Sequence, residues 1–485
     1  MEINKALTFD DVLLVPKKSN HLPAESITKT FLTNDIGLGI PIISAAMDTV
    51  SDYRLAIAIA QLGGIACIHK NMSIEEQSQQ IKNVKKFESG MVIDPITISP
   101  DEDISFAIDL MKSNKISGIP VVDKNKKLVG IITNRDLRFT KNLKAKVKDL
   151  MTKKVITVNE GVNSEHAKKL LHKYRIEKLV VVNKQFKCTG LITVKDLEKS
   201  QVFPDASKDK NQSLRVAGAI GVNKEGLNRA ELLLESGADA LILDTAHGHS
   251  QSVINTVKNI KKKFKFKNLI VGNVATGDAA KELADNGADT IKVGIGPGSI
   301  CTTRVVAGVG MPQFTAIQNV SSALKNYKVR VIADGGIRYS GDIAKAIGAG
   351  ADMVMIGSLF AGTDEAPGEI FYYQGRSYKS YRGMGSLSAM ARGSADRYFQ
   401  EDIKDNLKLV PEGIEGRVPY RGPVKNIINQ LVGGLKASMG YIGAKTIDEL
   451  KKKAKFVQIT NSGLKEGHVH NVQITKQSPN YPVEN

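Results

Sequence analysis

The chain has 485 residues, 42% of them hydrophobic, and a formal net charge of +18 at pH 7. This length is too great for one ordinary domain. Three widely spaced cysteines exclude a disulfide framework and suit a reducing compartment. The first residues lack the pattern of a signal peptide, and no apolar run reaches the roughly 20 residues that span a bilayer. We therefore expect a soluble cytoplasmic protein.

The excess of positive charge raises the question of a nucleic-acid partner. The charge is scattered along the chain, and there is no tryptophan. The basic block KKKFKFK at 261–267 follows VINTVKNI and is interpreted as the solvated end of a helix. Residues 94–200 hold 22 lysines and arginines against 13 acidic residues, a net charge of +9. A basic module can collect anionic small molecules, so a nucleic-acid partner is not required.

Short apolar runs alternate with amphipathic stretches on both sides of residues 93–202. They lie at 41–47, 64–69, 215–222, 240–248, 269–276, 290–298, 329–337 and 353–362. Eight strands alternating with helices predict an α/β fold, a (β/α)8 barrel (TIM barrel) made of residues 1–92 and 203–485. A doubly wound open sheet is the alternative. Gly-Ala-Asp precedes three of the strands, where glycine suits the left-handed residue that ends a helix.

Residues 93–202 contain an internal duplication. Residues 95–137 align without a gap on residues 155–197, within repeats of about 93–145 and 150–200. Each copy predicts a short strand, a helix and two further strands. The pair resembles a tandem cystathionine-β-synthase-type (CBS) module inserted in the barrel. That resemblance implies purine nucleotides as ligands of the module, and a purely structural insertion is the alternative.

Polar and glycine residues follow the expected strands, at the barrel end where catalytic groups gather. They include Ser44, Asp244, Asn273, the loop 294–301, Asp334 to Gly336, and Gly357 with Ser358. The last two groups follow the seventh and eighth strands, where barrels commonly hold a phosphate. Glycine N–H groups and a hydroxyl suit a phosphate, and a carboxylate suits a ribose diol. Ordinary turn glycines are the alternative reading of these pairs.

Cys301 lies in the glycine-rich loop GIGPGSICTTR, three residues before an arginine. Backbone N–H groups and cations favour the thiolate, which is the reactive form of cysteine. Cys301 is therefore a candidate nucleophile, against the alternative of a small buried side chain. Residues of about 365–423 form a long segment rich in glycine, serine, arginine and tyrosine. We expect this segment to be a mobile lid over the site.

Eight motifs together resemble the inosine-5′-monophosphate (IMP) dehydrogenase family. They are LTFDDVLLVP, SAAMDTV, GNVAT, GIGPGSICTTR, ADGGIRYSGDIAKA, YRGMGS, DRYF and PEGIEGRVPY. With the CBS-like insertion, the resemblance covers essentially the whole chain, and the lid is similar to the bacterial type. It implies an NAD-dependent oxidoreductase that converts IMP to xanthosine monophosphate (XMP) with NAD+, in guanine nucleotide synthesis.

The resemblance assigns the chemistry to four residues. Cys301 attacks C2 of the purine, a hydride leaves for the nicotinamide, and water hydrolyses the covalent thioimidate. Arg397 and Tyr398 enter the site after NADH leaves, and Arg397 activates the water, although an arginine side chain is rarely a base. Thr303 matches an accessory proton-relay threonine.

The resemblance also implies the ligands of each binding site. The residues implied for IMP are Ser44, Ser299, Asp334, Gly335, Gly336, Gly357, Ser358, Tyr381, Arg382, Gly383, Met384, Gly385 and Glu412. Those implied for NAD+ are Asp244, Asn273, Gly294, Ile295 and Gly296. A monovalent cation, K+, would bind Gly294, Gly296 and Cys301, with Glu466, Gly467 and His468 from a neighbouring subunit. The implied assembly is a homotetramer that can pair into an octamer through the CBS modules.

Two other functions compete with this reading. GMP reductase shares the barrel, the cysteine loop and the phosphate site, but uses NADPH in a reductive deamination. The DRYF motif and the CBS-like repeat both argue against it. A regulatory protein with an inactive barrel is the other alternative, and the intact set of Cys301, Thr303, Asp334 and Arg397 argues against that.

Overall fold

The computed structural model describes residues 3–481 except 88–91, 94, 115, 141, 161, 195–196, 198–201, 401, 404 and 406–407. The chain forms two compact units. One contains Met1–Lys85, Asp205–Ser207 and Arg215–Asn485, and the other contains Lys86–Pro204 and Lys208–Leu214. The predicted boundaries at 92–93 and 202–203 lie seven and two residues from the crossings at 85–86 and 204–205, and residues 208–214, predicted in the barrel part, belong to the second unit. The end of the second repeat, predicted at about residue 200, falls outside the described residues.

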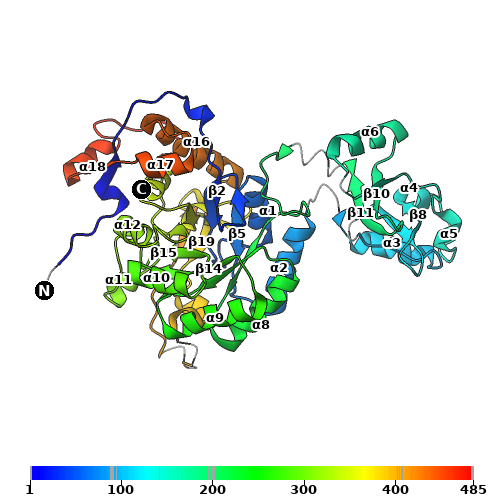
Figure 1. The fold of residues 1–485 in the computed structure, drawn as a ribbon, viewed down its shortest axis with the longest axis horizontal. Helices are drawn as coiled ribbons and strands as arrows, with labels where there is room; N and C mark the ends of the chain where they lie inside the picture. The colour runs from blue at the N-terminus through cyan, green and yellow to red at the C-terminus, as the bar shows by residue number, and fades with distance from the viewer. Residues whose placement is uncertain are drawn as a thin grey trace. The chain divides into compact units, whose positions relative to one another are not determined.

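A closed barrel of eight parallel strands is the centre of the first unit (Figure 1). Its strands are β4 (Ile42–Ser44), β5 (Ile65–Ile68), β12 (Ala217–Ile220), β13 (Ala240–Asp244), β14 (Leu269–Val274), β15 (Thr290–Val293), β16 (Arg330–Asp334) and β17 (Met353–Ile356). Each lies within a run predicted from the sequence, and β17 pairs with β4 to close the ring. The (β/α)8 prediction is confirmed and the open sheet is wrong.

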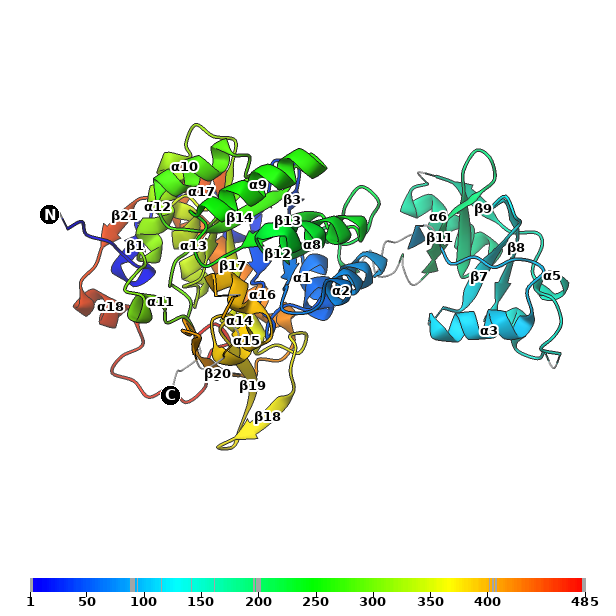
Figure 2. The same cartoon turned by 90° about the horizontal axis from the view of Figure 1, so that it is seen from below.

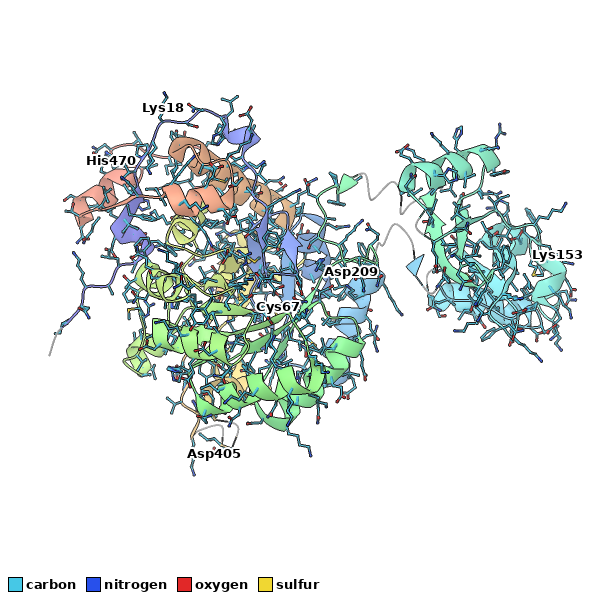
Figure 3. The ribbon with its side chains drawn as sticks, viewed as in Figure 1. Lys18, Cys67, Lys153, Asp209, Asp405 and His470 are labelled. Atoms are coloured by element: carbon cyan, nitrogen blue, oxygen red, sulfur yellow. The ribbon has the colours of Figure 1, made fainter. Side chains whose placement is uncertain are left out.

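Apolar side chains fill the inside of the barrel. Ile43, Cys67, Ile242 and Met355 belong to one buried cluster there, and Cys67 lies at the centre of this unit (Figure 3). The helices that surround the strands are α1 (Tyr53–Gln61), α2 (Ile74–Lys86), α8 (Asn223–Glu235), α9 (Gln251–Phe264), α10 (Gly277–Asp285), α12 (Gln313–Ala323), α13 (Ser340–Gly348) and α16 (Val424–Ile442). None of the helices in the described part of the chain has the length and apolar character to cross a membrane.

The Gly-Ala-Asp triplets form repeated corners between a helix and the next strand. Before β15, Gly287 has a φ of +105°, which ends α10 as the sequence predicts. The carboxylate of Asp289 accepts a hydrogen bond from the N–H of Leu269 (2.8 Å) and pairs with Lys261 of α9. The basic block 261–267 therefore begins at the end of a helix, as expected. Its first residue, Lys261, stabilises the corner before β15.

The second unit repeats one arrangement twice, except that the short strand expected at the start of the first copy is only a single bridge between Ile98 and Val121. The first copy contains α3 (Ile104–Ser113), β7 (Gly118–Val122) and β8 (Leu128–Thr133). The second contains β9 (Thr157–Asn159), α6 (Ser164–Tyr174), β10 (Lys178–Val182) and β11 (Cys188–Thr193). The register shifts between Val121 and Val122 in β7, and between Val181 and Val182 in β10. The two copies thus share even a strand irregularity at the offset of 60 residues that the sequence alignment gives.

The lid contains more regular structure than a long loop. Its strands β18 (Ile370–Tyr373), β19 (Arg376–Arg382) and β20 (Glu415–Pro419) form an antiparallel sheet, and the β18–β19 hairpin projects from the barrel (Figure 2). Helix α15 (Leu387–Ala391) and the 3-10 helix η3 (Ser394–Tyr398) lie between β19 and β20. After α16, strand β21 (Phe456–Gln458) pairs with β1 (Val12–Leu14), and α18 (Asn461–Gly467) follows.

Candidate active site

The carboxyl ends of the barrel strands and the lid together line a cavity of about 140 Å³. Its walls contain most of the residues predicted from the sequence. From the strand ends and the cysteine loop come Asp244, Asn273, Gly294, Gly296, Ser299, Cys301, Asp334, Gly335, Gly336, Gly357 and Ser358. From the lid come Tyr381, Gly383, Met384, Arg397, Tyr398 and Glu412. Segments that are far apart in the sequence therefore meet at one end of the barrel.

Several predicted ligands lie behind the cavity wall. The buried Ser44 hydroxyl accepts a hydrogen bond from Ser51 (2.7 Å). The Arg382 guanidinium donates to Asp48 (3.1 Å) and to Ser388 (2.9 Å), so it ties the lid to the loop after β4. The carbonyl of Ile295 accepts from Arg304 (3.2 Å). These side chains and this carbonyl shape the site without lining it.

The subsite after β16 and β17 has the features of a phosphate cradle. Gly335 and Gly336 have φ values of +93° and +80°, which residues with a side chain rarely adopt, and both line the cavity. A Cβ atom at Gly357 would lie 3.1 Å from the Tyr381 hydroxyl, so a larger residue there would crowd it. Burial raises the pKa of Tyr381 to about 12, and its hydroxyl therefore stays protonated and can donate to an anion at neutral pH.

Cys301 lies at the head of a short chain of polar groups. Its half-buried thiol donates to the Thr303 hydroxyl (3.2 Å), and that hydroxyl donates to the Glu412 carboxylate (2.7 Å). A backbone hydrogen bond joins the same two segments, because Thr302 N–H donates to the carbonyl of Glu412 (3.0 Å). Cys67 is completely buried, and burial raises the pKa of its thiol. A proton can thus move between the Cys301 region and a lid carboxylate through one hydroxyl.

Lys292 is a site residue that the sequence analysis missed. Its side chain is 1% exposed and lies inside the barrel, where its ammonium group is 2.9 Å from Asp244 and 2.7 Å from Asp334. It also contacts the Asn273 amide oxygen. One cation therefore links the carboxylates predicted for the cofactor and for the substrate ribose. The available signal was a lysine within the apolar strand TIKV, where a charge needs partners.

The lid pair Arg397 and Tyr398 lies inside the cavity. The Arg397 guanidinium forms an ion pair with Asp244, and the backbone carbonyl of Arg397 accepts a hydrogen bond from Ala246 N–H (2.9 Å). The Tyr398 ring covers Gly385, where a Cβ atom would lie 2.6 Å from the ring carbon Cζ. Burial raises the pKa of Tyr398 and keeps its hydroxyl protonated. Arg397 thus holds the acceptor predicted for the cofactor ribose.

Comparisons with known proteins identify the family. A family model described as the IMP dehydrogenase / GMP reductase domain matches residues 6–470. The chain belongs to this family. The inosine-5′-monophosphate dehydrogenase of Aquifex aeolicus (strain VF5) is 55% identical over 487 residues, which cover 100% of this chain and 99% of that relative. The enzyme of the same name from Helicobacter pylori (strain J99) is 56% identical over 480 residues, 99% of each chain.

A solved structure from the same family corrects one expectation. A GMP reductase of Trypanosoma brucei, a cysteine-to-alanine variant in complex with guanosine 5′-monophosphate, is 40% identical with a TM-score of 0.87. The match covers 97% of this chain and 99% of that one, so it includes the inserted repeat. The expectation that the repeat argues against a reductase is therefore wrong. The lid pair remains the feature that favours a dehydrogenase.

The residues predicted to bind K+ lie in two separate parts of the chain, the loop 294–301 and the end of α18. The Gly294 carbonyl accepts from the Asn273 side chain (2.7 Å), and Arg304 lies against Gly296. Glu466 and Gly467 end α18, which packs near the N-terminal segment. His468 lies 2.9 Å from the Tyr481 hydroxyl. A cation site shared with a neighbouring subunit stays a prediction.

Proposed function

We propose that this protein oxidises IMP to XMP with NAD+ through a covalent intermediate on Cys301. The observation that carries the proposal is the convergence of Cys301, Thr303 and Glu412 beside the Gly335–Gly336 phosphate cradle, under a lid that supplies Arg397 and Tyr398. The named relatives support the reaction. In this assignment the cradle and Tyr381 bind the phosphate, and Asp334 accepts from the ribose hydroxyls.

The first half of the reaction uses the thiol of Cys301 as the nucleophile. The Cys301 sulfur forms a bond to C2 of the hypoxanthine ring as the thiol proton is released to solvent, and the C2 hydrogen then leaves with its electron pair as a hydride. NAD+ supplies the hydride acceptor when it is bound. The substrate is oxidised, and a thioimidate links the purine to Cys301.

The second half of the reaction is hydrolysis of the thioimidate. Water adds to C2, the carbon–sulfur bond breaks, and the thiolate of Cys301 returns with release of XMP. The Thr303 hydroxyl and the Glu412 carboxylate form a path that can take the proton of the water. Arg397 and Tyr398 line the same cavity, where they orient the water and exclude bulk solvent.

The residues present fit NAD+ when the lid is withdrawn. Asp244 is a carboxylate at a strand end, suited to a ribose diol, and Asn273 and the glycine loop lie beside it. The Arg397 guanidinium pairs with the Asp244 carboxylate here. The cofactor ribose and the docked lid therefore cannot bind this carboxylate at the same time. We infer that the lid enters only after the reduced cofactor leaves.

Four further assignments belong to the same proposal. K+ would bind carbonyl groups of the loop 294–301 with the C-terminal residues of a neighbouring subunit, in a homotetramer that can pair into an octamer. The paired repeats of residues 93–202 would bind purine nucleotides. We place the protein in the cytoplasm, and within the described residues no disulfide joins its cysteines. A nucleic-acid partner is not required.

One assay decides between the two activities of the family. Purified protein is given IMP and NAD+ in K+ and then in Na+ buffer, beside Cys301→Ala and Cys188→Ala. We expect K+-stimulated NADH formation that only the Cys301 variant loses. GMP reductase is the second candidate, favoured by the T. brucei structure. Consumption of NADPH with GMP and no NADH from IMP would support that reading instead.

A further inference from the structure

A second ion pair holds the lid helix η3 in the cavity. Next to Arg397, which pairs with Asp244, the Asp396 carboxylate pairs with the ammonium group of Lys70 in the loop after β5. The Lys70 side chain is 8% exposed and that of Asp396 is 24% exposed. Two successive residues of η3 are thus each bound to an opposite charge of the barrel, one at the end of β13 and one in the loop after β5.

The surroundings leave Asp396 as the main partner of Lys70. Glu225 also lies near, but its carboxylate is engaged by the Arg229 guanidinium (2.9 Å). At Gly221, a Cβ atom would lie 2.6 Å from the Asp396 carboxylate and 3.7 Å from the Lys70 ammonium group. The barrel therefore keeps an open space into which Asp396 fits when η3 docks.

We propose that Lys70 is a positioning residue for the hydrolytic step, acting through Asp396 to stabilise the docked lid against the cofactor. This inference rests on the proposed function. The lid and the cofactor compete for Asp244, while Lys70 pairs with the lid residue Asp396. Lys70 therefore favours one of two exclusive states, and it sets their ratio without contacting substrate or cofactor.

The competition gives the proposal a signature in the kinetics. A weakened Lys70–Asp396 pair leaves Asp244 open for longer after the first half-reaction. Turnover then falls, because the hydrolytic arrangement is populated less, and NAD+ inhibits at lower concentration, because it binds the open form of the covalent intermediate. The initial burst of NADH precedes lid docking and stays unchanged.

The test compares Lys70→Met, Lys70→Arg, Asp396→Asn and the double variant Lys70→Met/Asp396→Asn by stopped-flow and steady-state NADH absorbance. We expect Lys70→Met and Asp396→Asn to lower kcat and the inhibition constant of NAD+ by roughly ten-fold each, a usual size for coupling between two sites. The double variant should match the single ones, since they remove one interaction. Lys70→Arg keeps the charge and should restore most of the turnover.

The matched control is Lys263→Met, which removes an ion pair with Glu231 on the barrel surface (2.8 Å). It should change none of these quantities. A Lys70→Met variant with normal turnover, or one in which the burst and turnover fall equally, would overturn the inference. Absence of an NADH burst in the unaltered protein would instead reject the proposed dehydrogenase function.

Discussion

Thr303 joins the candidate nucleophile to a carboxylate that belongs to the lid. Its hydroxyl accepts from Cys301 and donates to Glu412, so one small side chain lies between the nucleophile and the lid carboxylate. Only the second half needs a proton carrier between water and a base. The two halves should therefore respond differently when this hydroxyl is removed.

We expect Thr303→Val to separate the two halves. Valine has nearly the volume of threonine but cannot carry a proton, so the NADH burst should survive while steady-state turnover falls about 100-fold. Stopped-flow absorbance measures both quantities in one experiment. Thr302→Val is the control, because Thr302 contacts Glu412 through its backbone, which valine keeps. Equal loss of the burst and of turnover in the Thr303 variant would contradict the relay.

His69 provides a pH prediction at the same scale. Burial lowers the pKa of His69 to about 4, and its ring accepts a hydrogen bond from Asn71 N–H (3.2 Å). An unfolded histidine has a pKa near 6.5, so between about pH 6.5 and 4 the unfolded chain binds the extra proton. Stability should therefore fall as the pH drops through this window, by at most about 1.4 kcal/mol per pH unit from this group.

Urea unfolding at pH 7 and pH 5 measures this dependence. His69→Gln keeps an acceptor for Asn71 and removes the titration, so its stability should fall less between the two pH values. His470→Gln, at an exposed histidine, serves as the comparison. The same pH dependence in His69→Gln and in the unaltered protein would show that other groups cause it.

Local motifs made part of the site predictable from the sequence. Cys301, Asp334 and the paired glycines stand in short unusual stretches at strand ends, and all of them line the cavity. Lys70 could not be predicted, since its partner Asp396 is 326 residues away and ion pairs leave no local pattern. Arg382 was assigned to the substrate because it stands in a motif, whereas Asp48 binds its guanidinium outside the cavity.

At the level of elements, the triplet corners and the lid differ in how well the sequence predicts them. Gly-Ala-Asp between an amphipathic stretch and an apolar run predicts the end of a helix followed by a strand, and the corners form as expected. The lid hairpin was not predicted, although the sequence has a glycine, Gly375, between its two strands. Gln374 and Gly375 have φ values of +46° and +74°, typical of a tight two-residue hairpin turn. Its strands contain few aliphatic residues, so they did not register as apolar runs.

The corner before β15 gives a prediction at this scale. Gly287→Ala should destabilise the protein by about 1–3 kcal/mol, because alanine is strained at a φ of +105° and its Cβ would lie 3.1 Å from Lys261. Gly341→Ala is the control, since that helical glycine has no atom within 4 Å of a Cβ and alanine favours helix. Thermal unfolding compares the two. Equal melting temperatures would mean that the corner is not under steric constraint.

At the scale of the whole molecule, the regular spacing of apolar runs and of the repeat allowed most of the fold to be predicted. Eight apolar runs predicted the barrel, and the offset of 60 residues predicted two equivalent halves in the second unit. Crossing points between the units are harder to predict, because they depend on which residues pack together. Asp205–Ser207 belong to the barrel unit, where Ser207 N–H donates to Ala60 of α1 (2.7 Å).

This division predicts that the barrel folds without the repeat. All the cavity residues belong to the barrel unit, which has its own core. A variant in which a short Gly/Ser linker replaces residues 86–204 should keep turnover within about two-fold and unfold in one cooperative transition. NADH formation and calorimetry measure the two properties. An insoluble or inactive product would mean that the barrel needs the repeat to fold.

The ion pair between Arg397 and Asp244 means that the chain carries a competitor of its own cofactor, attached to it by covalent bonds. Such a competitor acts at an effective concentration fixed by the length and stiffness of its tether, whatever the amount of protein. Dilution cannot remove it, whereas inserting residues beside η3 would weaken it. The apparent affinity for a dinucleotide then depends partly on the length and stiffness of the lid. Evolution or design can change the lid length, and with it this affinity, without altering the cavity.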